Sequence, residues 1–135
     1  MSYFKDLTEY EYGRPSNALN VGWLSNSEPY TEWTNTDIAN TAKQKFIDKF
    51  NERRPEYESF VKSWHKGIHH CEFCNASLGN FIIKLVGQDD KIYAVPSEFM
   101  HYVTEHNYMP PIEFIGSVLF GPKLTDELLS KEIFK

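Results

Sequence analysis

A chain of 135 residues, 41% hydrophobic and 24% charged, has the length and composition of one folded domain rather than of a disordered segment. Its formal net charge of -5 disfavours nucleic acids as partners, because proteins that bind them carry a basic surface. Two cysteines exclude a disulfide scaffold, and no apolar run reaches the length of a signal peptide or a membrane span. We therefore expect a single cytoplasmic domain over residues 1–135 that has no membrane partner.

The first third of the chain predicts a packed N-terminal segment, a strand and a loop. Aromatic residues are dense in residues 1–14, so we expect this segment to pack on the domain. Apolar and polar residues alternate in residues 18–24, which predicts a short, half-buried strand. Residues 25–36 are rich in turn formers and predict an exposed loop, in which Trp33 is the tryptophan that we expect at the surface.

Two helices are predicted next. The first begins at Thr36 or Asp37, either of which can cap it, and Pro55 limits its length because the residue before proline resists helical geometry. Its inward face is expected to consist of Ile38, Ala42, Phe46, Ile47 and Phe50. The second helix is indicated by the spacing of Tyr57, Phe60, Val61 and Trp64. The many lysines and arginines of residues 43–66 are interpreted as a solvated helical face, because acidic residues are mixed among them.

The second half of the chain predicts a β-hairpin followed by helices. Residues 81–86 and 91–95 are β-prone apolar runs, and the residues between them have turn chemistry. Pro96 suits the first turn of a helix that continues to about residue 105. Further helices are expected over residues 112–119 and 125–134. Helices added to a hairpin predict a mixed α+β fold.

A metal-binding pattern lies across this hairpin. Cys71 and Cys74 form a Cys-x-x-Cys pair on a predicted turn, and His101 and His106 lie on the helix that follows the hairpin. Zinc takes four nitrogen or sulfur ligands in a tetrahedron, and two sequence-local pairs supply them. The order of knuckle, hairpin and helix is that of treble-clef fingers. We therefore predict a zinc-binding subregion over about residues 67–109.

The two histidines raise a geometric question. On an ideal helix, residues five positions apart point about 140° away from each other. Both His101 and His106 can bind one ion only if the helix loosens near its end, where Asn107 is a suitable C-terminal cap. His70, beside the cysteine pair, is the substitute candidate for His106 as the fourth ligand.

Charge indicates a structural role for the ion. Two thiolates and two neutral imidazoles neutralise Zn2+ and leave no open position for water, so such a site is a poor Lewis acid. A thiol–disulfide redox pair is the other common use of Cys-x-x-Cys. Such pairs open a helix in a βαβ unit, whereas a turn and a hairpin follow here.

Several segments also resemble a known family. They are Tyr-Phe-Lys-Asp-Leu-Thr at residues 3–8, Asn-Val-Gly-Trp-Leu at 20–24, His-Cys-Glu-Phe-Cys at 70–74, Tyr-Ala-Val-Pro at 93–96, and His-Tyr-Val at 101–103. Together with the Cys-x-x-Cys and His-x4-His pattern, they are similar to a family of small uncharacterised bacterial proteins. The resemblance implies a bacterial, single-domain, cytoplasmic protein, and it implies no activity.

The sequence favours a zinc-stabilised protein that acts through contacts with another protein. A basic protein is one candidate for this partner. The sequence holds no Gly-rich phosphate loop, nucleophile elbow or His-Glu-x-x-His motif, so no catalytic residue is assigned. One alternative is a metal-dependent hydrolase or nuclease with an open zinc site near His69 or His70. A second alternative is a nucleic-acid-binding zinc finger.

Overall fold

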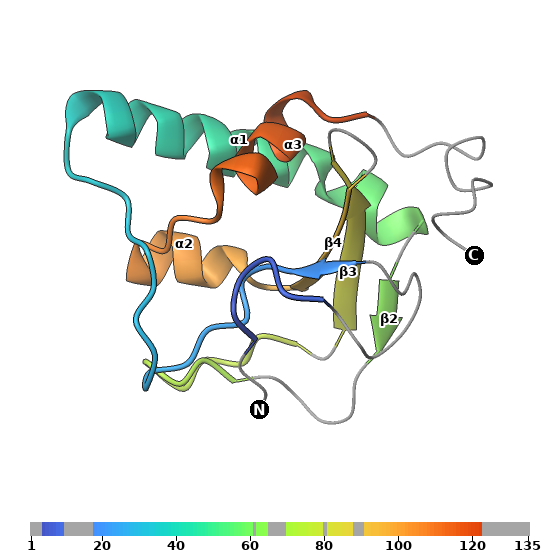
Figure 1. Cartoon of the computed structure of the whole chain (residues 1–135), viewed down its shortest axis with the longest axis horizontal. Coiled ribbons are helices and arrows are strands. Elements are labelled where there is room, and N and C mark those ends of the chain that lie inside the picture. The colour runs from blue at the N-terminus through green and yellow to red at the C-terminus, as the bar shows by residue number, and fades with distance from the viewer. Residues whose placement is uncertain are drawn as a thin grey trace.

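The computed structural model describes residues 4–9, 18–60, 62–64, 70–79, 81–87 and 91–122. In chain order the elements are β1 (Leu19–Asn20), α1 (Asp37–Phe60), β2 (Lys62–Trp64), β3 (Phe81–Val86), β4 (Ile92–Pro96), α2 (Met100–His106) and α3 (Ile112–Phe120). This is the α+β fold that the sequence predicts (Figure 1). The helix predicted over residues 125–134 lies outside the described residues. Of the helices that are described, none has both the length and the apolar character needed to traverse a bilayer.

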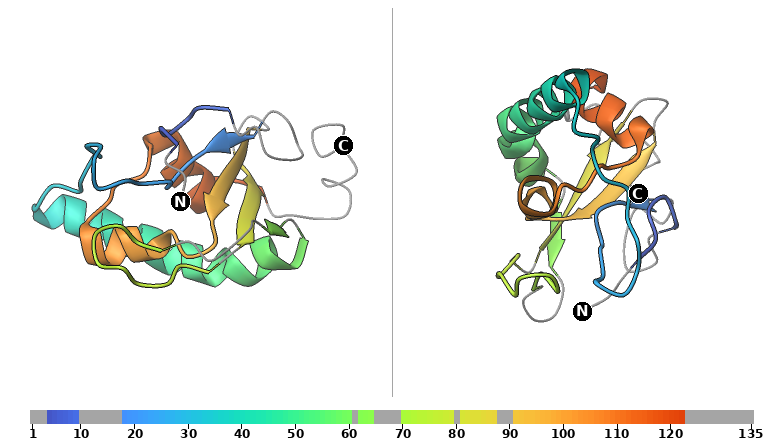
Figure 2. Two further views of the ribbon diagram at one scale, coloured as in Figure 1. Left: turned by 90° about the horizontal axis from the view of Figure 1, so that it is seen from below. Right: turned by 90° about the vertical axis from the view of Figure 1, so that its left-hand side faces the viewer.

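The strands form one sheet in the order β1-β4-β3-β2. The predicted hairpin is confirmed, because β3 and β4 pair antiparallel from Val86↔Ile92 to Ile82↔Pro96. β2 pairs antiparallel with the outer side of β3, and β1 pairs parallel with β4. Figure 2 shows α1 and α2 on one side of the sheet and the N-terminal segment on the other. Both faces are therefore covered, which explains why every residue of β4 is buried.

Two sequence predictions at the edges of the strands are wrong. Residues 18–24 do not form a half-buried strand: only Leu19–Asn20 pair as β1, and the segment is almost wholly buried because the sheet lies against it. Pro96 does not begin a helix but ends β4, and α2 starts at Met100. The fixed φ of proline suits both positions, and here the Pro96 carbonyl accepts the backbone N–H of Phe99 in a tight turn.

Helix α1 continues through Pro55 to Phe60, so the prediction of two separate helices is wrong. Proline removes one helical hydrogen bond, which is a local cost. This cost is offset by the burial of a row of three rings on one face of the helix, those of Phe46, Phe50 and Tyr57. The ring centroids of Phe50 and Tyr57 lie 5.6 Å apart, on either side of the proline in sequence. Burial of this row holds the helix together past Pro55, and Trp64 lies in β2 instead of on a second helix.

The first turns of α1 project beyond the rest of the fold. Thr36 caps the helix as predicted, because its Oγ1 accepts the backbone N–H of Ala39 at 3.1 Å. The predicted inward face is wrong at its N-terminal end: Ile38 is 86% exposed and Ala42 is also exposed. Figure 1 shows the reason, since this end of α1 extends past α2 and α3 and no helix or strand of the described residues lies opposite it.

The N-terminal segment and the loop before α1 supply aromatic residues to the core. Phe4 packs edge-on against Trp23 with ring centroids 5.3 Å apart, as expected for an N-terminal segment that packs on the domain. The prediction that Trp33 is exposed is wrong, since it is 6% exposed and packs against Phe46. Its backbone N–H donates to the carbonyl of Asn107, which fixes the loop to the end of α2.

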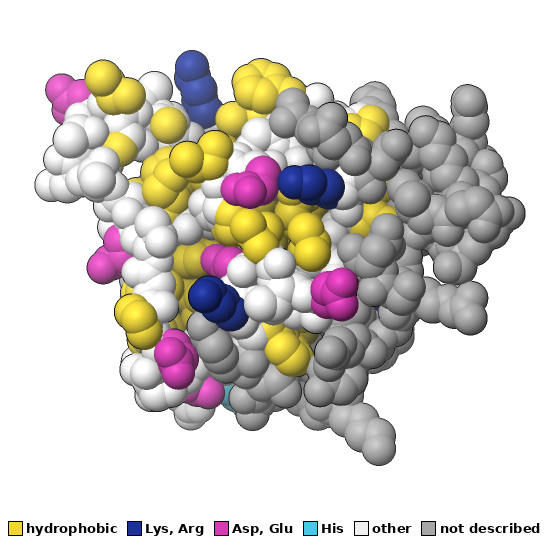
Figure 3. All heavy atoms as spheres, viewed as in Figure 1, with side chains coloured by type: hydrophobic (Ala, Val, Ile, Leu, Met, Phe, Trp, Pro, Cys, Tyr) yellow, Lys and Arg dark blue, Asp and Glu magenta, His cyan; other side chains and the backbone are white. Residues whose placement is uncertain are grey.

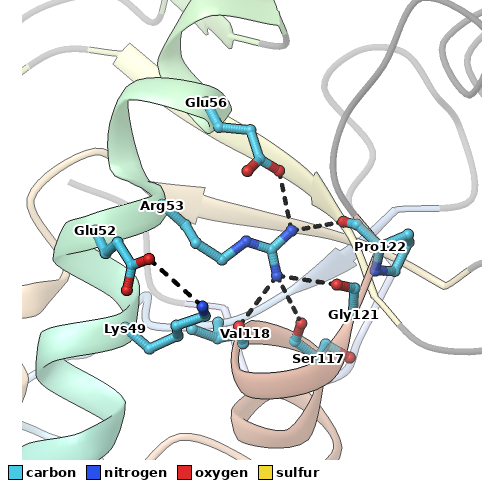
Figure 4. Close-up of polar contacts among 8 residues, drawn as sticks. All are labelled: Lys49, Glu52, Arg53, Glu56, Ser117, Val118, Gly121 and Pro122. Carbon is cyan, nitrogen blue, oxygen red and sulfur yellow. Dashed lines mark hydrogen bonds and ion pairs between the residues drawn. The ribbon is translucent and has the colours of Figure 1, made fainter.

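Arg53 departs from the predicted solvated face of α1. Its side chain is 7% exposed, and its guanidinium forms an ion pair with Glu56 at 2.9 Å (Figure 4). The guanidinium also donates to four carbonyls at the C-terminal end of α3, those of Ser117, Val118, Gly121 and Pro122. The last carbonyls of a helix have no partner within it, so Arg53 caps α3 and joins it to α1.

Candidate metal centre

The cysteine pair lies on a tight turn between two antiparallel backbone segments. The backbone N–H of Cys71 donates to the carbonyl of Ala76 at 2.9 Å, and the N–H of Asn75 donates back to the carbonyl of Cys71 at 2.6 Å. Asn75 has a φ of 63°, a left-handed conformation that asparagine adopts more readily than most residues. This turn brings the side chains of Cys71 and Cys74 to the same side of the chain.

The histidine pair lies at the two ends of α2, and the final turn of this helix is widened. His101 is the second residue of α2 and His106 is the last. Asn107 follows as a left-handed cap with φ 56°, and its N–H donates to the carbonyl of Tyr102, five residues back instead of four. The N–H of Tyr108 donates to the same carbonyl at 3.0 Å. The predicted loosening is thus present, and the two imidazole rings lie with centroids 5.1 Å apart.

These two segments bring four donor atoms into one cluster, named here the Cys2His2 cluster. The Sγ of Cys71 lies 3.3 Å from Nε2 of His106, and the Sγ of Cys74 lies 3.2 Å from Nε2 of His101. All four ligand atoms lie within 4.8 Å of one another. In a tetrahedral zinc site with two sulfur and two nitrogen ligands, neighbouring donors are about 3.4–3.8 Å apart. The Cys2His2 cluster therefore has the size needed to hold one metal ion.

The surroundings favour neutral donors in the absence of a cation. Burial raises the pKa of the Cys71 thiol, although the backbone N–H groups of Phe73 and Cys74 act in the opposite direction. Burial also lowers the pKa of His101, and the neighbouring His106 lowers it further. A neutral imidazole is the form that binds a metal, and a bound cation would favour the Cys71 thiolate that burial otherwise disfavours.

Side chains from a distant loop hold the turn and the helix against each other. The carboxylate of Glu72 accepts the hydroxyl of Ser25 at 2.9 Å and the backbone N–H of Asn26 at 3.1 Å. Tyr30 donates its hydroxyl to the carbonyl of His106 at 2.8 Å. The ring of Phe73 lies between those of Tyr30 and His106, at 5.5 and 4.9 Å. The loop before α1 therefore supports both halves of the cluster.

The structure separates His70 from the four predicted ligands. His70 is exposed, and its backbone bridges to Ser77 across the turn. Within the described residues it is not part of the Cys2His2 cluster, which contains His106. His69, the other histidine of the open-site alternative, lies outside the described residues.

Sequence reasoning missed the residues that support the cluster. Glu72 and Phe73 lie inside the Cys-x-x-Cys element, so their position was a usable signal. Tyr30 carried no such signal, because it contacts the carbonyl of a residue 76 positions away. A contact of that kind depends on the path of the whole chain.

A family model described as a domain of unknown function (DUF7919) matches residues 2–119. The chain belongs to this family. The predicted membership of an uncharacterised family is thereby confirmed at that level, and DUF7919 carries no described activity. Searches of curated proteins and of solved structures gave no match. The functional argument for this DUF7919 domain therefore rests on the geometry of the Cys2His2 cluster.

Proposed function

We propose that Cys71, Cys74, His101 and His106 bind one structural Zn2+ ion, and that the protein is a zinc-stabilised, non-enzymatic module that acts through contacts with another protein. The observation that carries the proposal is the convergence of two sulfur and two nitrogen donors within 4.8 Å. These donors come from two segments on either side of a hairpin, which matches the order of a treble-clef finger.

Zinc is the metal that suits this donor set best. Magnesium and calcium prefer oxygen ligands, whereas two thiolates and two imidazoles in a tetrahedron are typical of zinc. The ligand charges sum to zero with Zn2+, so the filled site can be partly buried at low cost. A reducing compartment such as the cytoplasm would keep both thiols available for the metal.

The role proposed for the ion is structural because four protein donors complete its coordination. No position remains for water or substrate, so the ion would not act as a Lewis acid. Structural zinc contributes an apparent binding energy of about 10–16 kcal/mol, which is comparable with a whole domain stability of about 5–15 kcal/mol. The ion would hold the turn at residues 70–79 against α2 and stabilise residues 67–109 within a single 1–135 domain.

The proposed contact with another protein is supported by the surface. Hydrophobic side chains gather over α1 and α3 on the face shown in Figure 3. Ile38, Ile112 and Phe120 are 86%, 75% and 76% exposed, and exposed apolar patches commonly mark the surfaces by which proteins bind each other. The net charge of -5 favours a basic partner.

Metal content of the untagged protein tests the zinc proposal directly. Elemental analysis is expected to find one zinc ion per chain in the parent protein and none in Cys71→Ser. The matched control is His70→Ala, which changes an exposed histidine next to the ligand and should keep its zinc. Parent protein without stoichiometric metal would refute the proposal, and zinc loss in His70→Ala would indicate that His70 is a ligand.

Cobalt substitution tests whether the coordination is closed. Co2+ in a tetrahedral site with two thiolates gives intense visible absorption, and an open position would bind azide and change that spectrum. We expect azide to leave the spectrum unchanged. A spectral change that His70→Ala abolishes would instead support the hydrolase or nuclease alternative.

A further inference from the structure

A cleft of about 370 Å³ lies between the N-terminal segment and the loop that precedes α1. Phe4, Lys5 and Asp6 form one wall, and Leu24, Glu28 and Tyr30 are among the residues of the other. This volume is within the range of small-molecule sites. None of these residues is a ligand in the Cys2His2 cluster, although Tyr30 also supports the cluster through its hydrogen bond to the carbonyl of His106.

Both walls are held in place by contacts outside the cleft. Phe4 packs edge-on against the ring of Trp23, and its backbone N–H donates to the Trp23 carbonyl. Tyr30 donates its hydroxyl to the carbonyl of His106, and its ring packs edge-on against Tyr108 at 6.2 Å. The two aromatic rings that line the cleft are therefore positioned before any ligand arrives.

The charged groups of the cleft favour a cation. The cleft is lined by two carboxylates, those of Asp6 and Glu28, and by one ammonium group, that of Lys5. Asp6 is fixed, because its two oxygens accept the backbone N–H of Gly22 at 3.1 Å and the hydroxyl of Tyr108 at 2.7 Å. Burial raises the pKa of its carboxyl above the ordinary value. Among the described ion pairs none involves Asp6, so a cation in the cleft would compensate its burial.

We propose that this cleft binds a primary alkylammonium group, the chemistry shared by a free small amine and a lysine side chain. The ammonium would lie near Asp6 and Glu28, where a carboxylate still has lone pairs for further donors. Aromatic rings attract cations, and Phe4 and Tyr30 supply two of them. The alkyl stem would lie along Leu24 and these rings, as lysine stems do on apolar surfaces.

Calorimetric titration of the full-length protein with three matched probes tests the ligand class. The probes are n-butylammonium, 1-butanol and butyrate, which share an alkyl chain and differ in charge. We expect saturable binding of n-butylammonium alone, at concentrations up to about 10 mM because so small a ligand binds weakly. No saturation by n-butylammonium, or equal affinity for 1-butanol, overturns the proposal.

Charge variants test the place of binding. Glu28→Gln should weaken n-butylammonium binding by about fivefold, the effect of one unit charge a few ångströms away in water. Lys5→Gln should strengthen it by a similar factor, because it removes a like charge. Glu52→Gln, an exposed acid on α1 that does not line the cleft, is the matched control and should change little. Weaker binding by Lys5→Gln, or equal effects of Glu28→Gln and Glu52→Gln, contradicts the assignment.

A blocked peptide with one lysine between glycines separates the two sources of the ammonium. Binding at least as tight as that of n-butylammonium assigns the cleft to a lysine of a protein partner, and binding of n-butylammonium alone assigns it to a free amine. Either result supports the ammonium site. The zinc content of each variant is measured in parallel, so failure of this inference is distinguished from failure of the zinc proposal.

Discussion

Replacement of Arg53 by methionine is expected to lower the free energy of unfolding by about 3 kcal/mol. Methionine keeps most of the apolar stem, so the change isolates the guanidinium. Two of the carbonyls that the guanidinium binds belong to buried residues, Ser117 and Val118. After the substitution the Ser117 carbonyl keeps a second donor, the N–H of Gly121 at 2.8 Å. The carbonyl of Val118 keeps no other described donor, and an unsatisfied buried carbonyl costs about 1–3 kcal/mol.

Loss of the ion pair adds to this cost. Glu56 is 18% exposed and pairs with Arg53 at 2.9 Å, so it loses a charge partner in a partly desolvated position. The matched control is Lys49→Met, one turn earlier on α1 (Figure 4). Lys49 pairs with Glu52 at 3.7 Å, and their side chains are 37% and 69% exposed, so its removal should cost no more than about 0.5 kcal/mol.

The free energy of unfolding of the parent protein and both variants is measured by urea denaturation, monitored by circular dichroism and by tryptophan fluorescence. Coincident transitions establish that unfolding is two-state, and equal slopes establish that the midpoints report stability. All proteins are compared at equal metal content. A difference below about 1 kcal/mol between Arg53→Met and Lys49→Met would refute the argument that Arg53 caps α3.

Further predictions concern the metal centre, acid stability and two positions on helix α1. Removal of zinc should speed amide hydrogen exchange most in residues 70–79 and 24–33, which are linked to the cluster, and less in β3; an equally large increase in β3 would contradict this coupling. Because the pKa of Asp6 is raised, its carboxyl holds a proton more tightly in the folded than in the unfolded state. The protein therefore loses the stability that this group contributes as the pH rises from the ordinary pKa of 3.8 through the raised pKa. Urea midpoints measured against pH should show this decline in the parent protein and not in Asp6→Asn. Ile38→Ser should change stability by less than about 0.5 kcal/mol, whereas Phe46→Ala should cost about 3–5 kcal/mol, both measured by urea denaturation.

The sequence predicts which four side chains lie close together, because each of the two pairs is local in sequence. Cys71 and Cys74 are three positions apart, and one tight turn brings their sulfurs together. Asn107 is confirmed as the cap of α2, since a residue that tolerates positive φ is recognisable from its type alone. The antiparallel pairing of β3 with β4 is likewise confirmed, because the two strands are neighbours in sequence.

Predictions of burial are less successful, because burial depends on what packs opposite. Ile38 has the helical spacing of a core residue, but within the part of the chain that the structure describes no helix or strand lies over that end of α1. Trp33 lies in a polar loop, yet Phe46 and the end of α2 cover it. The sequence pattern describes one face of one element and carries no information on whether a partner reaches that face.

What the sequence by itself determined about this protein is the set of four candidate ligands, the hairpin between them and the α+β class. What only the tertiary structure decided is the continuation of α1 through Pro55, the burial of Arg53 at the end of α3, and the support of the cluster by Tyr30. Hydrogen bonds and turns between near neighbours follow from residue type and spacing. Contacts between distant segments follow from the free energy of the whole packed core, which no short stretch of sequence contains.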